Sequence, residues 1–410
     1  MLFIYKILIN IIFFFSPLIL IIRLIKKKED PYRFKEKLGF FSKNKRYGKL
    51  IWFHGASVGE VQSVIPLIER FEKNRNIRQI LITSNTVSSS NIIKKFKLRK
   101  TIHQFFPIDC DFISKKFIDY WKPSKVFFID SEIWPNTINN LSSKKIPIIL
   151  LNGRITKKTL RRWLVFPSFA KSLFKKFEIC FSSSLESKKY LKRLGAENIK
   201  YIGNLKFSQS ENEDLKLDKR LRNFIKSNNS WCASSTHYNE EKFCGQTHIK
   251  LSKKYKNLLT IIIPRHIGRA KSIQNELNNL NLKVHLDEPK KKISPDTNIY
   301  LVNSYGKTKS FYKECKNVFL GGSMINHGGQ NPLEAVRYGC KVFHGPNVSN
   351  FKEIYDFLKN KRLSKKITNH NTLANLLDMT FKKKSNPKQI SQNLYLIGKN
   401  ILNKTYKEIC

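Results

Sequence analysis

The sequence predicts an α/β protein made of two halves, and three observations lead to this fold class. Short apolar runs alternate with amphipathic helical patterns in the first half, the alternation recurs in the second half, and a polar stretch at residues 208–216 separates them. Such alternation is typical of parallel sheets covered by helices. The 410 residues suffice for two domains, each with its own core. We therefore expect two Rossmann-like domains facing a cleft, with ligands at the carboxyl ends of the strands.

The N-terminal segment, residues 1–28, is predicted to be a membrane anchor. Residues 7–22 are apolar apart from Asn10 and a Ser-Pro pair. As a helix they cover roughly 24 Å, less than the ~30 Å hydrocarbon layer, so the segment either spans with the help of its flanks or lies in the interface. Arg23 and the lysines at 26–28 follow, and no small-x-small cleavage site does. This favours an uncleaved anchor over a signal peptide and predicts that the following domain is cytoplasmic.

The first half, residues 29–207, is predicted to form one Rossmann-like domain. Its strand-like runs are residues 50–53, 80–83, 104–106, 126–129, 146–151 and 179–182. Between the first two runs, residues 61–71 place Val61, Val64 and Ile68 on one face of a helix.

The second half, residues 221–410, follows a linker predicted at residues 208–220. The linker is assigned from its polar composition. Strand-like runs then recur at residues 231–233, 258–263, 299–302, 318–320 and 342–343. A second parallel sheet covered by helices is expected from them.

The formal charge of +47, from 77 basic and 30 acidic residues, favours an acidic partner such as nucleic acid, an anionic membrane or a phosphorylated lipid. A composition rich in Lys, Asn, Ile and Phe accounts for part of it. The seven cysteines form no CxxC pair and the nine histidines no HExxH motif, so we predict no disulfide framework, metal site or cofactor. The triplet Asp109-Cys110-Asp111 resembles a metal signature, but helix N-capping explains it better.

A glycine-rich segment at residues 319–334 is the most informative stretch of the chain. An apolar strand ends in glycines, and the pair Gly328 and Gly329 leads to Asn331, a good N-cap, with Glu334 in the first turn of a predicted helix. Such a loop presents unblocked backbone N–H groups and the positive end of a helix, which suits a phosphate. Alternatively, Glu334 only completes a capping interaction.

Two carboxylates follow strands of the first half. Glu60 lies beside Gly59 and the start of a helix. A carboxylate there serves as a general base if its surroundings hold its pKa near the working pH, although a first-turn Glu that complements the helix dipole is an equally simple reading. Glu132, with Trp134 and Pro135, follows the fourth strand, where it either lines a sugar site or starts a helix.

Hydroxyls and cations follow two neighbouring strands of the second half. Ser235, Thr236 and His237 come after its first strand, and Arg265 comes after the next. Lys206 adds a cation near the junction of the domains. Because Arg, Lys and helix-start donors together bind phosphate tightly, this edge of the sheet is a predicted phosphate site.

These motifs resemble one family, the Kdo (3-deoxy-D-manno-octulosonic acid) transferases of lipopolysaccharide synthesis, over nearly the whole chain. In the family's order they are Arg33-Phe-Lys-Glu-Lys-Leu-Gly39, Gly55-Ala-Ser-Val-Gly-Glu60, Glu132-Ile-Trp-Pro-Asn136, Asn152-Gly-Arg154, Gly203-Asn-Leu-Lys-Phe207, Ser235-Thr-His237, Pro264-Arg-His266, Gly328-Gly-Gln-Asn-Pro-Leu-Glu334, Gly345-Pro-Asn347 and Asn350-Phe351.

The resemblance implies a GT-B fold, a CMP-Kdo donor and the lipid A precursor as acceptor, at the cytoplasmic face of the inner membrane. It implies that Glu60 is the general base of an inverting transfer, with Glu132 and Arg154 on the acceptor side and no metal or cofactor. It implies donor contacts from Lys206, Ser235, Thr236, His237, Arg265, Gly328, Gly329, Asn331 and Glu334, the last on the ribose hydroxyls. The basic residues at 157–162 are candidates for acceptor phosphates, or else form a solvated helix face. Anionic lipids of the membrane are expected partners of the basic chain.

The sequence departs from the family pattern in several places. Gln330 stands where His is expected, Asn303-Ser304 replaces an expected Asp-Thr, and Lys307 replaces an acidic residue. The loop Ser84-Asn85-Thr86 is also atypical. Two other functions stay open at this stage. One is a GT-B glycosyltransferase or epimerase that uses a UDP-sugar. The other is a membrane-associated nucleic-acid-binding protein, which explains the charge but predicts basic runs interleaved with aromatics; the sequence has none, so no nucleic-acid partner is predicted.

Overall fold

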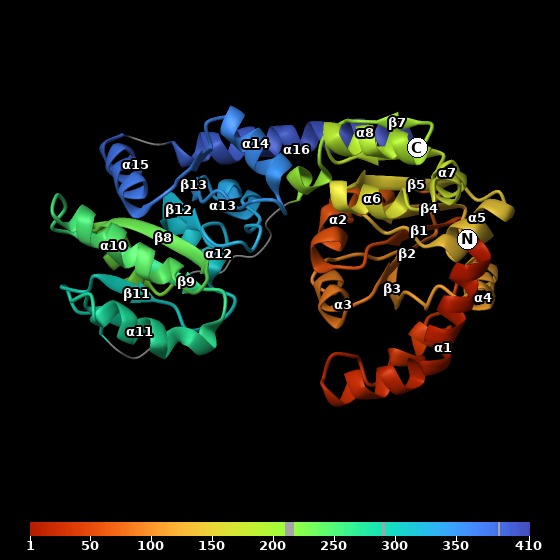
Figure 1. Ribbon diagram of the computed structural model, residues 1–410, viewed down its shortest axis with the longest axis horizontal. Helices are drawn as coiled ribbons and strands as arrows, with labels where there is room; N and C mark the ends of the chain where they lie inside the picture. Colours follow the sequence, from red (N-terminus) through yellow and green to blue (C-terminus); the bar gives the residue numbers. More distant parts are fainter. Residues whose placement is uncertain (210–216, 289–291, 384–385) are drawn as a thin grey trace. The chain divides into compact units, whose positions relative to one another are not determined.

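The computed structural model describes residues 1–209, 217–288, 292–383 and 386–410 (Figure 1). Its contacts form two compact units, Met1–Ser210 with Ile397–Cys410, and Glu211–Leu396. The predicted linker at 208–220 falls mainly on residues 210–216, which lie outside the described residues. The predicted domain boundaries stay predictions, although the end of the chain, expected in the second domain, is grouped with the first unit.

The first unit contains a parallel sheet with the strand order β3-β2-β1-β4-β5-β6-β7. Its strands are β1 (Leu50–His54), β2 (Gln79–Ser84), β3 (Thr101–Phe105), β4 (Lys125–Ile129), β5 (Ile148–Gly153), β6 (Ile179–Ser182) and β7 (Ile199–Lys200). Each of β1 to β6 overlaps a predicted run, with β3 earlier than expected. The two-residue β7 has no predicted counterpart, because so short a strand carries no periodicity.

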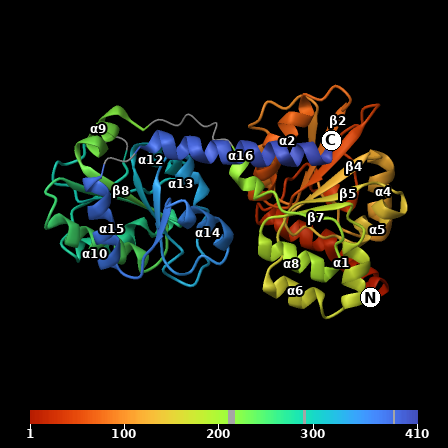
Figure 2. The same cartoon turned by 90° about the horizontal axis from the view of Figure 1, so that it is seen from above.

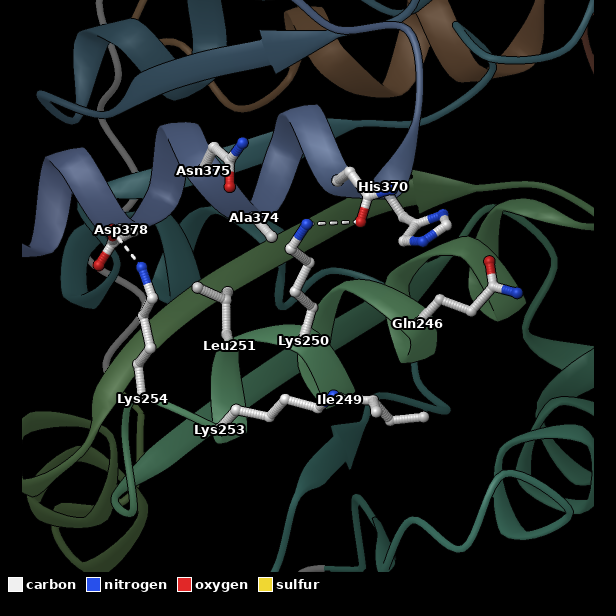
Figure 3. A pocket seen from close by; sticks show the side chains of 11 residues that line it. Gln246, Ile249, Lys250, Leu251, Lys253, Lys254, His370, Ala374, Asn375 and Asp378 are labelled. Atoms are coloured by element: carbon white, nitrogen blue, oxygen red, sulfur yellow. Dashed lines mark hydrogen bonds and ion pairs between the residues drawn. The ribbon is translucent and has the colours of Figure 1, made fainter.

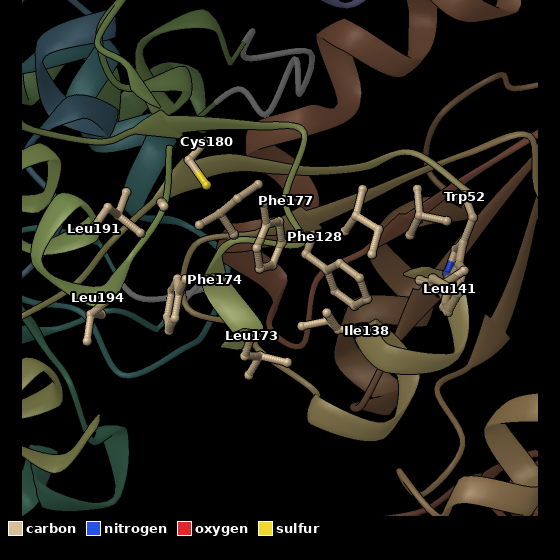
Figure 4. Packing of buried hydrophobic residues seen from close by; sticks show 14 of the residues in the cluster. Trp52, Phe128, Ile138, Leu141, Leu173, Phe174, Phe177, Cys180, Leu191 and Leu194 are labelled. Carbon is tan, nitrogen blue, oxygen red and sulfur yellow. The ribbon is translucent and has the colours of Figure 1, made fainter. Parts of the chain in front are cut away.

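Helices cover both faces of this sheet. They are α2 (Val58–Glu72), α3 (Val87–Ile93), α4 (Asp111–Trp121), α5 (Pro135–Ser143), α6 (Lys157–Trp163), α7 (Pro167–Phe174) and α8 (Leu185–Leu194), with short 3₁₀ turns at Phe34–Leu38 and Leu205–Ser208. On one face, Trp52 and Phe128 pack with apolar residues of α5 and α7 such as Leu141 and Phe174 (Figure 4). Burying such a face is the main stabilising contribution to the sheet.

The other face of the sheet is covered by α2 and by the end of the C-terminal helix α16 (Pro387–Ile409) (Figure 2). Phe53 stacks on Phe127, and both contact Phe71 of α2. Tyr406 of α16 packs on Phe71 with ring centroids 5.1 Å apart. Lys125 Nζ donates to the carbonyl of Ile409 at 2.7 Å. The last turns of the chain are therefore part of the first unit's core.

The second unit repeats the plan with the strand order β10-β11-β9-β8-β12-β13-β14, again parallel. Its strands are β8 (Asn229–Thr236), β9 (Leu258–Pro264), β10 (Val284–Leu286), β11 (Ile299–Leu301), β12 (Asn317–Leu320), β13 (Lys341–His344) and β14 (Ser364–Lys366). Its helices are α9 (Lys219–Ser227), α10 (Glu240–Ser252), α11 (Ala270–Asn278), α12 (Thr308–Glu314), α13 (Leu333–Arg337), α14 (Lys352–Asn360), α15 (His370–Lys382) and the start of α16. The edge strands β10 and β14 have no predicted counterparts.

The N-terminal segment forms α1 (Leu2–Ile25). Within the part of the chain that the structure describes, it is the one helix long and apolar enough to cross a membrane, with a mean hydropathy of 2.5 over its best window. Most of its side chains are exposed, whereas Ser16 and Leu20 are buried against the first unit.

Candidate active site

In the first unit's sheet, the strand order reverses between β1 and β4. From β1 the chain adds β2 and β3 on one side, and β4 and the later strands follow on the other side, all in parallel. In open parallel sheets, ligands bind outside the carboxyl ends of the strands at such a switch point. Glu60 lies in the first turn of the helix after β1, and the loop after β4 carries Asp130 and Glu132. The predicted base and the predicted acceptor-side carboxylate therefore come from the two strands that flank the switch point.

Glu60 lies in the first turn of α2, which begins at Val58, earlier than the predicted 61 because Ser57 caps it. One carboxylate oxygen accepts from the Ala56 N–H at 2.7 Å, and the other accepts from the Ser57 hydroxyl at 2.8 Å. Burial raises the pKa of Glu60 to about 7, and the negative charges of Glu132 and Asp130 add to this rise. Glu60 thus contributes to the start of α2, and its raised pKa is compatible with the predicted role of a base, which stays a prediction.

Glu132 is held by a network that the sequence did not reveal. Its Oε2 lies 3.1 Å from His54 Nε2 and accepts from Trp134 Nε1–H at 2.9 Å. On the other side of the imidazole, Nδ1 lies 2.9 Å from the Thr83 hydroxyl, which accepts from Trp52 Nε1–H at 2.8 Å. Trp134 Nε1 also lies 3.1 Å from His54 Nε2, so the imidazole, the indole and the Glu132 carboxylate contact one another. His54 is the last residue of β1, and this position at a strand end was the signal that could have revealed it.

The backbone of Asp130 lies in the left-handed region, with φ 57°, and Asp130 contacts the remaining predicted site residues of the first unit. Its carboxylate lies 2.8 Å from Lys206 Nζ and also accepts from the side-chain amide of Asn152. The Arg154 N–H donates to its carbonyl at 3.0 Å. Lys206, predicted to contact the donor, is therefore placed in the first unit as the partner of a carboxylate.

In the second unit, the predicted polar residues meet at the ends of β8 and β9. Ser235 has φ 57°, and the Arg265 N–H donates to the Thr236 carbonyl at 2.9 Å. β8 also pairs with β12, so its end adjoins the glycine loop that begins at Gly321, whose N–H donates to the Ser234 carbonyl at 2.8 Å. The structure thus brings together the hydroxyl, cation and glycine motifs that the sequence placed at separate strand ends.

Several backbone N–H groups of the glycine loop already have a hydrogen-bond partner, so the prediction that they are unblocked is wrong for this part of the loop. The buried carboxylate of Glu240, in the first turn of α10, accepts from the N–H groups of Gly322, Ser323 and Met324 at 2.7, 3.1 and 2.9 Å. It also accepts from the His237 N–H at 2.9 Å. The protein's own carboxylate therefore fills the anion position that this part of the loop offers.

The helix expected after the second glycine pair is short. It is α13, five residues long, and it begins at Leu333, whose N–H donates to the Asn331 side chain at 3.1 Å. Gly329 has φ 77° and donates its N–H to the Gly322 carbonyl at 2.8 Å. Glu334 lies 3.8 Å from Lys309 Nζ. A single short turn adds little dipole, so the helix start is a weaker phosphate site than predicted.

Gly328 lies in the left-handed region with φ 94°, and a Cβ there would approach Asn350 Nδ2 to 2.4 Å. Any residue with a side chain would therefore displace the neighbouring Asn350 and strain the backbone. One departure from the family pattern has a structural role, since Lys307 Nζ lies 2.6 Å from Asp287. At Gln330 the backbone carbonyl accepts from the Tyr355 hydroxyl at 2.9 Å, a contact that does not depend on the side chain.

Three histidines gather above the glycine loop. The ring centroids of His237 and His327 are 4.4 Å apart, and those of His237 and His266 are 5.9 Å apart. Burial, followed by the charges of His327, His266 and Arg265, lowers the pKa of His237 to about 4. His327 was missed by the sequence reasoning, because only the fold brings it beside His237. Arg265 and the hydrogen-bonding nitrogens of neighbouring imidazoles together suit an anionic ligand.

A groove of about 520 Å³ lies elsewhere, between α10 and α15 (Figure 3). Lys250 and Lys254 of α10 line it, and Lys254 Nζ lies 3.0 Å from Asp378 of α15. The predicted site residues do not line this groove, and it lies away from the strand ends. Among the described residues, no group of three or more His, Cys, Asp or Glu is arranged to hold a metal ion. Asp109 of the triplet instead accepts from the first N–H groups of α5, at Asn136 and Thr137.

The comparisons with known proteins agree with this architecture. A UDP-GlcNAc 2-epimerase from Neisseria meningitidis, solved with UDP-GlcNAc bound, has a similar structure with a TM-score of 0.61 and 15% identity, over 88% of this chain and 99% of that one. At this identity the likeness concerns the fold alone. The protein has the GT-B fold, as predicted.

Sequence comparison identifies the family. Residues 32–209 match the model of the 3-deoxy-D-manno-octulosonic-acid transferase (kdotransferase) family. A probable mitochondrial 3-deoxy-D-manno-octulosonic acid transferase of Arabidopsis thaliana is 31% identical over 345 residues, 81% of this chain and 76% of the relative. The 3-deoxy-D-manno-octulosonic acid transferase of Rickettsia bellii is 30% identical over 365 residues, 88% and 86% of the two chains. The chain belongs to the Kdo transferase family and is a glycosyltransferase.

Proposed function

We propose that this enzyme transfers Kdo from CMP-Kdo to a hydroxyl of the lipid A precursor, at the cytoplasmic face of the inner membrane, in lipopolysaccharide biosynthesis. Family membership supports the sugar, and the ordered motifs support the donor and acceptor. One observation carries the mechanism: Glu60, at the switch point of the first sheet, has a pKa raised by burial to about 7. A carboxylate with this pKa is basic and still substantially ionised near neutral pH.

Glu60 acts as the general base of an inverting displacement. Its carboxylate takes the proton of the acceptor hydroxyl while that oxygen bonds to the anomeric carbon of Kdo. The bond from the anomeric carbon to the phosphate oxygen of CMP breaks on the opposite side, and its electron pair leaves with CMP. Two hydrogen bonds, from the Ala56 N–H and the Ser57 hydroxyl, fix the carboxylate in place for this step.

The second unit holds the donor. Arg265 supplies positive charge at this site, and the imidazoles of His237, His266 and His327 offer further hydrogen-bonding groups. Phosphate placed there gains charge-assisted hydrogen bonds, which strengthen as negative charge develops on the departing CMP. Glu240 contributes indirectly, because it fixes the glycine loop beneath His237.

The first unit receives the acceptor. His54 and Trp134 orient Glu132, and Arg154 lies beside Asp130. The exposed basic side chains of α6 are the proposed contacts for the acceptor's phosphates: Lys157, Lys158, Arg161 and Arg162. The positive charges of α6 attract the acceptor's phosphates at the membrane surface, which favours the docking of the acceptor on this helix.

Mass spectrometry of lipid IVA incubated with the detergent-purified protein and freshly generated CMP-Kdo tests the proposal. An added Kdo mass is expected, and the number of added masses gives the number of transfers. Omission of CMP-Kdo is the control for carried-over product. If lipid IVA stays unmodified while a UDP-sugar is consumed, the donor assignment is wrong and the UDP-sugar alternative replaces it.

A further inference from the structure

One side of α1 is tied to the first unit by polar contacts. The Tyr5 hydroxyl donates to Asp109 Oδ2 at 2.8 Å, and Lys6 Nζ lies 3.2 Å from Asp111. Both carboxylates belong to the segment that leads into α4. Polar contacts of this kind bring the first turns of an apolar helix onto the folded domain.

Apolar contacts continue along the same side of α1. Phe13 meets Phe112 edge-on, with ring centroids 5.3 Å apart, and Ser16 and Leu20 are buried. From Tyr5 to Leu20 the attached side covers about 22 Å of helix axis, most of the ~30 Å thickness of the hydrocarbon layer. A helix attached over this length cannot cross the bilayer unless the folded unit enters it as well. The contacts therefore favour a helix that lies along the membrane surface over one that crosses the bilayer.

The remaining surface of α1 fits the bilayer interface. Phe3, Phe14 and Ile25 are among many exposed apolar side chains on it, with Phe14 78% exposed. Exposed lysines at residues 26–28 follow the helix directly. Apolar side chains in the acyl region with adjoining cations at the headgroups are typical of in-plane helices on anionic membranes.

Asp109 links this helix to the acceptor side of the site. The oxygen that accepts from Tyr5 also accepts from the Asn136 N–H at 3.0 Å, and the other oxygen accepts from the Thr137 N–H at 2.8 Å. These N–H groups begin α5, directly after the loop with Glu132 and Trp134. Asp109 is 1% exposed, so water does not substitute for a lost partner.

We propose that α1 lies in the plane of the membrane surface and that the Tyr5–Asp109 hydrogen bond couples its docking to the placement of Glu132 and Trp134. Tyr5 is thus a positioning residue for the acceptor side of the site. This catalytic consequence rests on the proposed function, whereas the in-plane docking of α1 does not.

Cross-linking in native membranes tests the docking. Phe13→Cys with Phe112→Cys, in a Cys410→Ser background, is treated with a short thiol-reactive cross-linker. The matched control is Phe14→Cys with Phe112→Cys, since Phe14 points away from the unit, and each single variant controls for the native Cys110. Cross-linking of the 13/112 pair, and not of the 14/112 pair, is expected. Absence of a 13/112 product, or equal products from both pairs, overturns the in-plane docking.

Tyr5→Phe tests the coupling, because it keeps the apolar ring and removes only the hydrogen bond to Asp109. We expect kcat with the lipid acceptor to fall about tenfold, while KM for CMP-Kdo and the membrane-bound fraction stay at wild-type values. Tyr32→Phe, at an exposed tyrosine beyond α1, is the control and keeps full activity. Wild-type kcat in Tyr5→Phe, or a loss confined to membrane binding, overturns the coupling. Failure of the proposed function is distinguished by the wild-type enzyme itself, which would then form no Kdo product.

Discussion

The two units place opposite chemistry at equivalent edges of similar sheets. At the β1–β4 switch of the first unit, Glu60, Asp130 and Glu132 lie near one another and the pKa of Glu60 rises. At the β8–β12 switch of the second unit, burial and neighbouring positive charges such as that of Arg265 lower the pKa of His237. Parallel sheets determine where a ligand binds, whereas the residues at the strand ends determine which chemistry is available there.

The role of the buried carboxylate also differs between the two units. Glu60 accepts two hydrogen bonds in a half-buried position and titrates near neutrality. Glu240 is almost fully buried and accepts from four backbone N–H groups. A carboxylate with few donors and acidic neighbours is suited to take up a proton, whereas one surrounded by donors is suited to fix a loop.

The largest effect is expected from the removal of Glu60, the proposed base at the β1–β4 switch of the first unit. Glu60→Gln should lower kcat about a thousandfold, because the amide cannot take the proton of the acceptor hydroxyl, while CMP binding and folding persist. Steady-state transfer assays and a CMP titration measure the two effects. Glu69→Gln on the same helix is the matched control. Near-normal turnover of Glu60→Gln would remove Glu60 from the base role.

The second prediction concerns the carboxylate that fixes the glycine loop. Glu240→Gln should lower the free energy of unfolding of the second unit by about 3 kcal/mol, since one amide oxygen cannot satisfy four buried N–H donors. Urea denaturation followed by circular dichroism measures the change. Glu276→Gln on α11 provides the same acid-to-amide change outside the loop. If both variants unfold alike, the loop does not depend on Glu240.

A smaller effect is expected from the removal of Arg265, which follows β9 in the second unit. Arg265→Ala should weaken CMP binding about thirtyfold, since one charge-assisted contact to phosphate is lost. Calorimetric titration with CMP measures it, and Arg220→Ala removes an exposed arginine elsewhere in the same unit as the control. Equal affinities of the two variants would show that net charge, and not Arg265, attracts the nucleotide.

The smallest predicted effect is a shift in pH dependence. Because the ionised form of Glu60 is the active base, kcat/KM should rise with pH through about 7. Glu132→Gln removes the second cause of the raised pKa, so the acidic limb should move to lower pH, although burial, the first cause, keeps it above the value of a solvated Glu. Transfer rates measured from pH 5 to 9 at constant ionic strength test this sign. A shift to higher pH would contradict the assigned charge coupling.

Strand-end positions made much of the site predictable from the sequence. Glu60, Arg265 and Thr236 follow apolar runs, and parallel strands bring such ends to one edge. His327 and Glu240 escaped prediction, because their partners are distant in the sequence and are brought close only by folding. The N–H groups of the glycine loop have no partner nearby in the sequence, so the sequence predicts that they are unblocked. The structure shows that Glu240 of α10 accepts from them.

The path of α16 has a practical consequence for dissecting this enzyme. The helix begins among residues of the second unit, and its end packs on Phe71 and Lys125. A fragment that stops at residue 209 would expose the surface that α16 covers. The first unit is thus discontinuous in the sequence, and it should fold stably only when the C-terminal peptide is fused to it or supplied in trans.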